Sequence, residues 1–231
     1  MMPNQGYKQR VIEIMTDPNR NPYAKFHQIN FDNYSYCDEE TPINKDIIND
    51  MPQAKIILTR EVYNWLLAIQ EETLSSNQEF PFLLYGYERE KNQIEFSDIM
   101  PFSSNRQSRV AVFDSNMQQD LQNKINANKN RNFVVCHGHS HTLIGDFCEN
   151  FSLGDFMAYM EMNESNGVFK NKEVELTGCV VTPSGDINFV YYDNHEKNFY
   201  RFTNVYVREM DNSLTPVNCY GLNQRQPQYG R

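Results

Sequence analysis

The sequence has few cysteines, no long apolar run and no strong excess of positive charge. The five cysteines are widely spaced and form no C-x-x-C pair: Cys37, Cys136, Cys148, Cys179 and Cys219. We therefore expect reduced thiols, and neither a disulfide framework nor a cysteine-based zinc site. No apolar stretch approaches the ~20 residues of a membrane helix, and the opening MMPNQGYKQR lacks the apolar core of a signal peptide. These absences predict a cytoplasmic protein with no membrane partner.

The charge balance also excludes one class of partner. The formal net charge is −9, and lysine and arginine do not cluster. Because phosphate contacts need clustered basic side chains, we expect no nucleic-acid partner. A partner with a basic face suits an acidic protein better. The sequence indicates no oligomeric state.

The remaining composition is that of a globular protein with one main domain. Hydrophobic residues make up 39% of the chain and aromatic residues 13%, which is enough to build one sizeable core. Short apolar runs precede this domain, and a segment rich in Pro, Asn, Gln and Gly follows it. We predict an N-terminal extension over 1–54, a domain over 55–210 and a C-terminal tail over 211–231.

Periodicity predicts the secondary structure of the domain. Apolar residues at helical spacing predict helices over 59–75, 115–128 and 152–163, the first with Thr59 as its N-cap. Short aromatic or β-branched runs between turn residues predict strands over 79–86, 93–102, 109–113, 132–136, 173–182, 186–192 and 199–208. Helices and strands alternate early and strands predominate in the last third. This order predicts an α+β fold with a mixed sheet flanked by helices.

Three histidines follow the apolar run 133–136 within five residues, His137, His139 and His141. Side chains two apart on an extended chain project to the same face, so a pair of these histidines can share one ion. Imidazole is a good zinc ligand. The alternative is a polar turn in which the histidines bind backbone groups. Three histidines at a spacing of two favour the metal.

A hydroxyl and a carboxylate lie three residues apart at the start of the next predicted helix, Ser152 and Asp155. Two imidazoles and one carboxylate are a common catalytic zinc set, in which the fourth position is left for water. The same S-x-x-D spacing is also typical of a capping box at a helix start. After a pair of histidines, the sequence favours both roles, with Ser152 at the helix end and Asp155 turned to the metal.

These motifs resemble the JAMM, or MPN-plus, family of zinc metalloproteases, whose signature is an upstream Glu, then H-x-H, then S-x-x-D. The upstream part is Glu79-Phe-Pro-Phe-Leu-Leu-Tyr-Gly86 after an amphipathic helix, and the similarity spans about 56–192. The resemblance implies an MPN/JAB fold and a zinc ion bound by His139, His141 and Asp155. It also implies Glu79 as general acid and base, Ser152 as a donor to the oxyanion, and cleavage of a peptide or isopeptide bond, including that of a ubiquitin-like modifier.

The chain departs from the family pattern after the second histidine. Thr142 stands where the family usually has proline, and ten residues separate His141 from Ser152 where seven are usual. Asp146 and Glu149 in this loop are therefore alternatives to Asp155 as the ligand. His137 could also take the place of His141, although we favour a position behind the ligands, where it would support them by hydrogen bonding.

Two other functions are compatible with parts of the pattern. A non-catalytic MPN-like scaffold would keep the fold and hydrolyse nothing, but relatives of that kind typically lose the ligands, which this chain keeps. A metallophosphoesterase would share the G-H-x-H segment, but the further His and Asp segments that such enzymes need are missing here. The zinc isopeptidase or peptidase is the interpretation that uses all the motifs.

Overall fold

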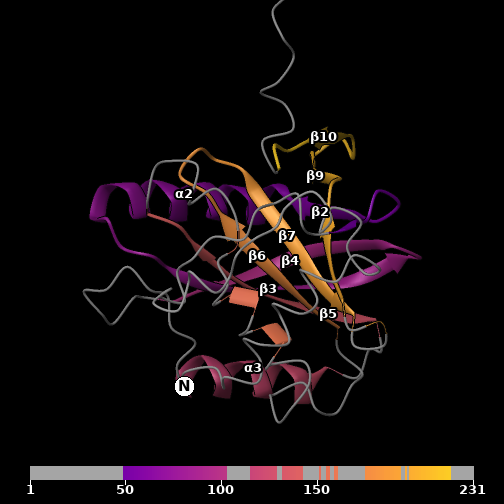
Figure 1. The fold of residues 1–231 in the computed structure, drawn as a ribbon, viewed down its shortest axis with the longest axis horizontal. Helices are drawn as coiled ribbons and strands as arrows, with labels where there is room; N and C mark the ends of the chain where they lie inside the picture. Colours follow the sequence, from indigo (N-terminus) through magenta and orange to yellow (C-terminus); the bar gives the residue numbers. More distant parts are fainter. Residues whose placement is uncertain are drawn as a thin grey trace, which may run out of the picture.

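Ten strands form a single mixed sheet at the centre of the described chain (Figure 1). The computed structural model describes residues 49–102, 115–128, 132–142, 151, 155–156, 159–160, 175–193, 196 and 198–219. Along the chain the elements are β1 (Asn49–Asp50), β2 (Lys55–Thr59), α2 (Arg60–Ser76), β3 (Pro81–Glu90), β4 (Gln93–Pro101), α3 (Ser115–Ala127), β5 (Phe133–Ser140), β6 (Glu175–Val181), β7 (Ile187–Asp193), β8 (Asn198–Phe202), β9 (Val205–Arg208) and β10 (Leu214–Pro216).

The strand order across the sheet is β1-β8-β7-β6-β5-β3-β4-β2-β9-β10. The histidine strand β5 lies near the middle, antiparallel to β3 and parallel to β6. The ends of the sheet come from segments far apart in sequence, since β1 pairs with β8 and β2 pairs with β9. The sheet thus holds β5 from both sides along its whole length.

The predicted helix-flanked fold of MPN/JAB type is wrong. The described chain is a curled mixed sheet of ten strands, and only α2 and α3 are complete helices within it. Short strands that carry no clear local pattern, β1, β2 and β10, account for much of the difference. In β1, Asn49 pairs with Tyr200, 151 positions away, and in β2, Ile56 pairs with Val205, 149 positions away. Local periodicity contains no information on such pairs.

Several local predictions are nevertheless confirmed. Helices α2 and α3 lie within two residues of their predicted ranges, as do the strands β4, β6 and β7. Strand β3 is shifted toward Glu90, and β5 extends four residues beyond the predicted 132–136, so that it includes His137 and His139. The predicted strand 199–208 is divided into β8 and β9. The predicted strand 109–113 lies outside the described residues. Of the predicted helix 152–163, residues 155–156 and 159–160 are described, and they are helical.

The start of α2 follows from its sequence. Thr59 is the N-cap, and its side chain accepts a hydrogen bond from the Val62 amide. Asn77 ends the helix in the left-handed conformation with φ 54°, a conformation that Asn adopts more readily than most residues. One side of the helix is buried along its length, through Val62, Leu66, Ile69 and Thr73.

Two apolar clusters pack against β3 from opposite sides. Alternate side chains of β3 point to opposite faces, so Phe82 and Leu84 pack in the cluster that includes α2, whereas Leu83 and Tyr85 pack with Leu121 of α3. Figure 1 shows α2 and α3 on opposite sides of the sheet. Strand β5 therefore contributes to a core on each face.

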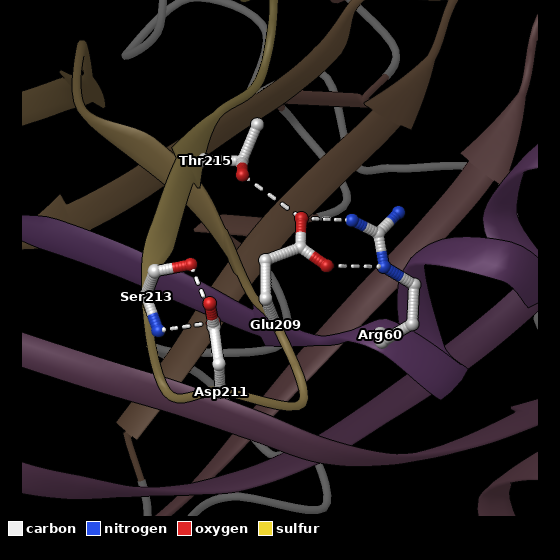
Figure 2. A network of polar contacts seen from close by, with 5 residues as sticks. All are labelled: Arg60, Glu209, Asp211, Ser213 and Thr215. Atoms are coloured by element: carbon white, nitrogen blue, oxygen red, sulfur yellow. Dashed lines mark hydrogen bonds and ion pairs between the residues drawn. The ribbon is translucent and has the colours of Figure 1, made fainter.

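The hairpin of β9 and β10 is joined to the start of α2 by a surface network (Figure 2). Arg60 donates to both carboxylate oxygens of Glu209, and Thr215 donates to the same carboxylate at 2.8 Å. In the turn, Ser213 donates to Asp211 from its amide at 2.9 Å and from its hydroxyl at 2.6 Å. These contacts fix the hairpin against the helix.

The described residues bear on three further predictions, which concern the cysteines, a membrane-spanning helix and the domain boundaries. Cys136, Cys179 and Cys219 are free and buried, as expected of reduced thiols. Within the described part of the chain, neither helix has the length and apolar character that crossing a membrane would require. Strands β1 and β10 lie on the outer sides of the domain boundaries predicted after 54 and 210, and the division into extension, domain and tail stays a prediction.

Candidate metal site

The strand β5 presents its histidines from a fully buried and doubly paired position. All eight residues of the strand are buried. His139 lies opposite Pro81 of β3 and Val180 of β6, and the His141 amide continues the pairing by donating to the Val181 carbonyl at 3.0 Å. Because side chains alternate along a strand, the histidines two apart share one face. The local sequence and the sheet register agree on this geometry.

Asp155 completes a group of three possible metal ligands with two of these histidines. The His139 and His141 Nε2 atoms are 2.9 Å apart. The Asp155 carboxylate approaches His139 Nε2 at 3.3 Å and His141 Nε2 at 3.9 Å. One ligand atom from each residue lies within 4.8 Å of the others. The structure therefore brings together the two histidines and the aspartate that the sequence selected.

The distances suit one small ion between the three side chains. Ligand atoms about 2.1 Å from a tetrahedral ion lie about 3.4 Å from one another, and the observed separations fall on both sides of this value. The side chains are 8%, 11% and 15% exposed for His139, His141 and Asp155. A buried set of two nitrogens and one oxygen fits a metal ion.

The ionisation of His139 also suits metal binding. Burial lowers its pKa to about 4, an effect that the neighbouring Asp155 carboxylate opposes and that His141 reinforces. The imidazole is therefore neutral at physiological pH, and its ring nitrogen is available to a cation without loss of a proton.

A glycine on β6 lets the segment that carries Asp155 pack closely on the sheet. The Tyr159 ring lies over Gly178, where a Cβ atom would be 2.3 Å from Tyr159 Cε2. One turn before it, Phe156 packs edge-on against Phe199 at 4.6 Å between ring centroids. Any side chain at position 178 would push Tyr159 away, and with it the helical residues that place Asp155. This role was not predictable from the sequence, because a glycine within a strand pattern has many causes.

His137 shares the face of the ligands but is not part of their group. Its ring packs edge-on against Tyr159 with the centroids 6.0 Å apart. Burial, with a smaller effect of His139 in the same direction, lowers its pKa to about 3, although Asp155 opposes the shift. The group of possible ligands among the described residues contains His141 and not His137.

The register between β3 and β5 brings the neighbour of Glu79 beside the segment that carries the histidines. Pro81 lies opposite His139, and Phe80 is joined to Ser140 by a hydrogen bond from the Ser140 amide to the Phe80 carbonyl at 3.2 Å. Glu79 directly precedes Phe80 and lies just before the first residue of β3. Ser152, Asp146 and Glu149 lie outside the described residues.

Sequence reasoning missed a pair of buried hydroxyls directly behind the site. Thr73 of α2 and Ser140 of β5 are 1% and 0% exposed, and their hydroxyl oxygens are 2.6 Å apart. The only available signal was a threonine that continues the apolar spacing of Val62, Leu66 and Ile69. A buried polar residue in such a stripe indicates a partner, but the sequence does not name it.

Comparisons with known proteins add little. No family model matches the sequence, and no curated protein is similar to it. Among solved structures, the solution structure of protein DSY2949 from Desulfitobacterium hafniense is 14% identical and covers 67% of this chain and 93% of its own, with a TM-score of 0.44. A similarity this low indicates neither a shared fold nor a shared function.

Proposed function

We propose that this protein is a zinc-dependent hydrolase of peptide or isopeptide bonds, similar in its chemistry to the JAMM metalloproteases. The observation that supports the proposal is the convergence of His139 and His141, at the end of β5, with Asp155, which follows His141 by 14 positions and belongs to a helical segment. The proposal concerns the chemistry of the site and does not depend on an MPN/JAB fold.

The donor set favours zinc among the common divalent ions. Magnesium and calcium prefer oxygen ligands, whereas imidazole nitrogen with one carboxylate is a frequent set in catalytic zinc sites. With three protein ligands, the fourth position is free for water or for a substrate carbonyl. A closed structural site would use a fourth protein ligand instead.

The chain supplies the groups that such a reaction needs. A bound zinc ion would lower the pKa of its water to about 7 and polarise the scissile carbonyl. Glu79 would accept the proton of the attacking water and deliver it to the leaving amine. The Ser152 hydroxyl would donate a hydrogen bond to the developing oxyanion, a contact that contributes a few kcal/mol in other hydrolases, about the cost of removing one such donor.

The substrate in this proposal is a protein or peptide, with a ubiquitin-like modifier as the first candidate. The acidic net charge of −9 favours a partner with a basic face and disfavours nucleic acid. We place the reaction in the cytoplasm, where the three described free thiols would stay reduced.

The test combines metal analysis with hydrolysis of a substrate panel. Purified protein should contain about one zinc ion per chain and should cleave ubiquitin-like fusions, isopeptide conjugates or plain peptides. Asp155→Asn should lose both zinc and activity, because the amide is a weaker ligand. Glu79→Gln should keep zinc and lose activity by about a hundredfold or more, since it removes only the proton acceptor.

Four outcomes would contradict the proposal. If the wild-type protein binds no zinc, it is not a zinc-dependent hydrolase. If the Glu79→Gln variant keeps full activity, Glu79 is not the proton acceptor. Zinc binding without turnover of any peptide or isopeptide would favour the non-catalytic scaffold instead. Hydrolysis of phosphate esters alone would favour the phosphoesterase, and for this reason a phosphomonoester belongs in the panel.

A further inference from the structure

A short chain of hydrogen bonds connects helix α2 to the strand that carries the histidines. The Thr73 hydroxyl donates to the Ile69 carbonyl of its own helix at 2.7 Å. Since a hydroxyl has a single hydrogen, Thr73 can only accept from Ser140, and the Ser140 hydroxyl is the donor across their 2.6 Å contact. The direction of the chain is therefore fixed, from Ser140 to Thr73 to Ile69.

The same Ser140 hydroxyl accepts a hydrogen bond from the other side. The Phe80 amide donates to Ser140 Oγ at 3.0 Å, while the Phe80 carbonyl accepts from the Ser140 amide at 3.2 Å. Ser140 thus binds Phe80 twice, once with its backbone and once with its side chain. Phe80 precedes the first residue of β3, so these two bonds extend the pairing beyond the strand.

The position of this double contact links it to the proposed reaction. Ser140 lies between the two histidine ligands along β5, and its side chain points to the opposite face of the strand, toward α2. Phe80 directly follows Glu79. The hydroxyls therefore touch no ligand atom, but they hold the backbone next to the residue that would move the proton.

We propose that Thr73 and Ser140 are positioning residues that hold Glu79 at the metal site. Thr73 orients the Ser140 hydroxyl so that its lone pair faces the Phe80 amide, and the bound amide holds the backbone that carries Glu79. This inference rests on the proposed function for the role of Glu79. In this proposal, the position of Glu79 relative to the metal depends on a polar contact on the face of β5 opposite to the histidines.

The test uses substitutions that separate the hydroxyl of Thr73 from its shape. Thr73→Val keeps the shape and removes the hydroxyl, whereas Thr73→Ser keeps the hydroxyl. We expect Thr73→Val to lower kcat about tenfold to a hundredfold, as is usual for residues that support a metal site from behind, with KM and zinc affinity close to wild type. Thr73→Ser should restore most of the activity. In Ser140→Ala, hydrogen exchange at the Phe80 amide should become faster, a readout that needs no turnover.

Ser75→Ala is the matched control, because Ser75 lies in the same last turn of α2 and its exposed hydroxyl bonds only to the Glu72 carbonyl of the helix. It should change neither kcat nor the Phe80 exchange rate. If Thr73→Val has wild-type kcat, or loses zinc in parallel with activity, Glu79 is not what the hydroxyls position. If wild-type protein binds no zinc, the proposed function itself fails, which is a distinct result.

Discussion

Helix α2 is joined to the sheet by polar contacts near both of its ends, and the two contacts differ in charge and in exposure. Near its start, Arg60 pairs with Glu209, and these side chains are 37% and 27% exposed (Figure 2). In its last turn, the uncharged Thr73 meets Ser140 in a place where both are almost fully buried. The first contact joins surface elements, and the second lies behind the candidate metal site.

The difference in exposure between the two contacts indicates which of them determines the local geometry. When two charged side chains at the surface form an ion pair, each loses part of its hydration, and their attraction is weakened by the surrounding water. The net contribution of such a pair to the free energy of unfolding is therefore small. A buried hydroxyl pair contributes little more while it is intact, but breaking it leaves a polar group without water, which costs much more. Because any movement that breaks the Thr73–Ser140 hydrogen bond has this cost, the two side chains are held in one relative position. We expect the geometry of the site to depend on the buried end of α2 and not on the exposed end.

Acidification should have the largest effect, and it should act on the buried histidines of β5, on the face of the strand opposite to the Thr73 contact. Burial lowers the pKa of His137 to about 3 and that of His139 to about 4, against an ordinary value near 6.5. Above about pH 6.5 both the folded and the unfolded chains carry neutral imidazoles, so stability does not change with pH. From there down to about pH 4 only the unfolded chain takes up protons, and stability should fall by about 1 kcal/mol per pH unit for each imidazole.

The measurement is denaturant unfolding of metal-free protein, kept free of metal by a chelator, at several pH values between 7.5 and 4.5. This range covers about three pH units and ends where the carboxylates of Asp and Glu begin to titrate. The exposed end should not respond in this range. Hydrogen bonds from Thr215 and Arg60 hold the pKa of Glu209 below its ordinary value, and those from Ser213 do the same for Asp211. A flat stability profile would show that the histidines are not buried as neutral groups.

Removal of the buried hydroxyl should have the next largest effect. Thr73→Val leaves the Ser140 hydroxyl without its acceptor in the interior, which should lower the free energy of unfolding by about 1–3 kcal/mol. The loss should be the same at low and high salt, because neither group is charged. Ser76→Ala, an exposed hydroxyl on the same turn, is the control. If the two variants lose equal stability, the contrast between the two ends of α2 does not hold.

The exposed ion pair should have the smallest effect. In a double-mutant cycle of Arg60→Gln and Glu209→Gln, we expect a coupling free energy smaller than the loss in Thr73→Val, and one that decreases as salt is added. Chemical denaturation with urea is suitable, because urea adds no ionic strength. A coupling as large as that of the buried pair, or one that salt does not change, would contradict this ranking.

Local patterns predicted the parts of the fold that short segments can specify. The spacing of Val62, Leu66 and Ile69 with Thr59 as N-cap defined α2 almost to the residue, because helix formation depends on neighbours within one or two turns. The apolar run predicted only the first half of β5, because the polar residues from His137 to Ser140 carry no strand pattern of their own. The fold class was predicted wrongly, since pairs such as Asn49 with Tyr200 depend on the rest of the sheet.

The candidate site divides in the same way. The spacing of His139 and His141 fixed their shared face before any tertiary contact was known, because alternation is a property of the extended chain. The approach of Asp155, in contrast, depends on Tyr159 packing over Gly178. The link from Thr73 to Ser140 joins residues 67 positions apart. Neither contact leaves a pattern in the sequence that reasoning on single segments could recognise.

The sequence by itself determined which side chains could bind a metal and on which strand they stand, since residue type and a spacing of two are local properties. Only the tertiary structure decided that Asp155 reaches the two histidines and that α2 supports the strand from behind. The reason is physical, because metal coordination needs three ligand atoms within a few ångströms of one point. Residues that are distant in sequence come that close only when the elements of the fold pack against one another.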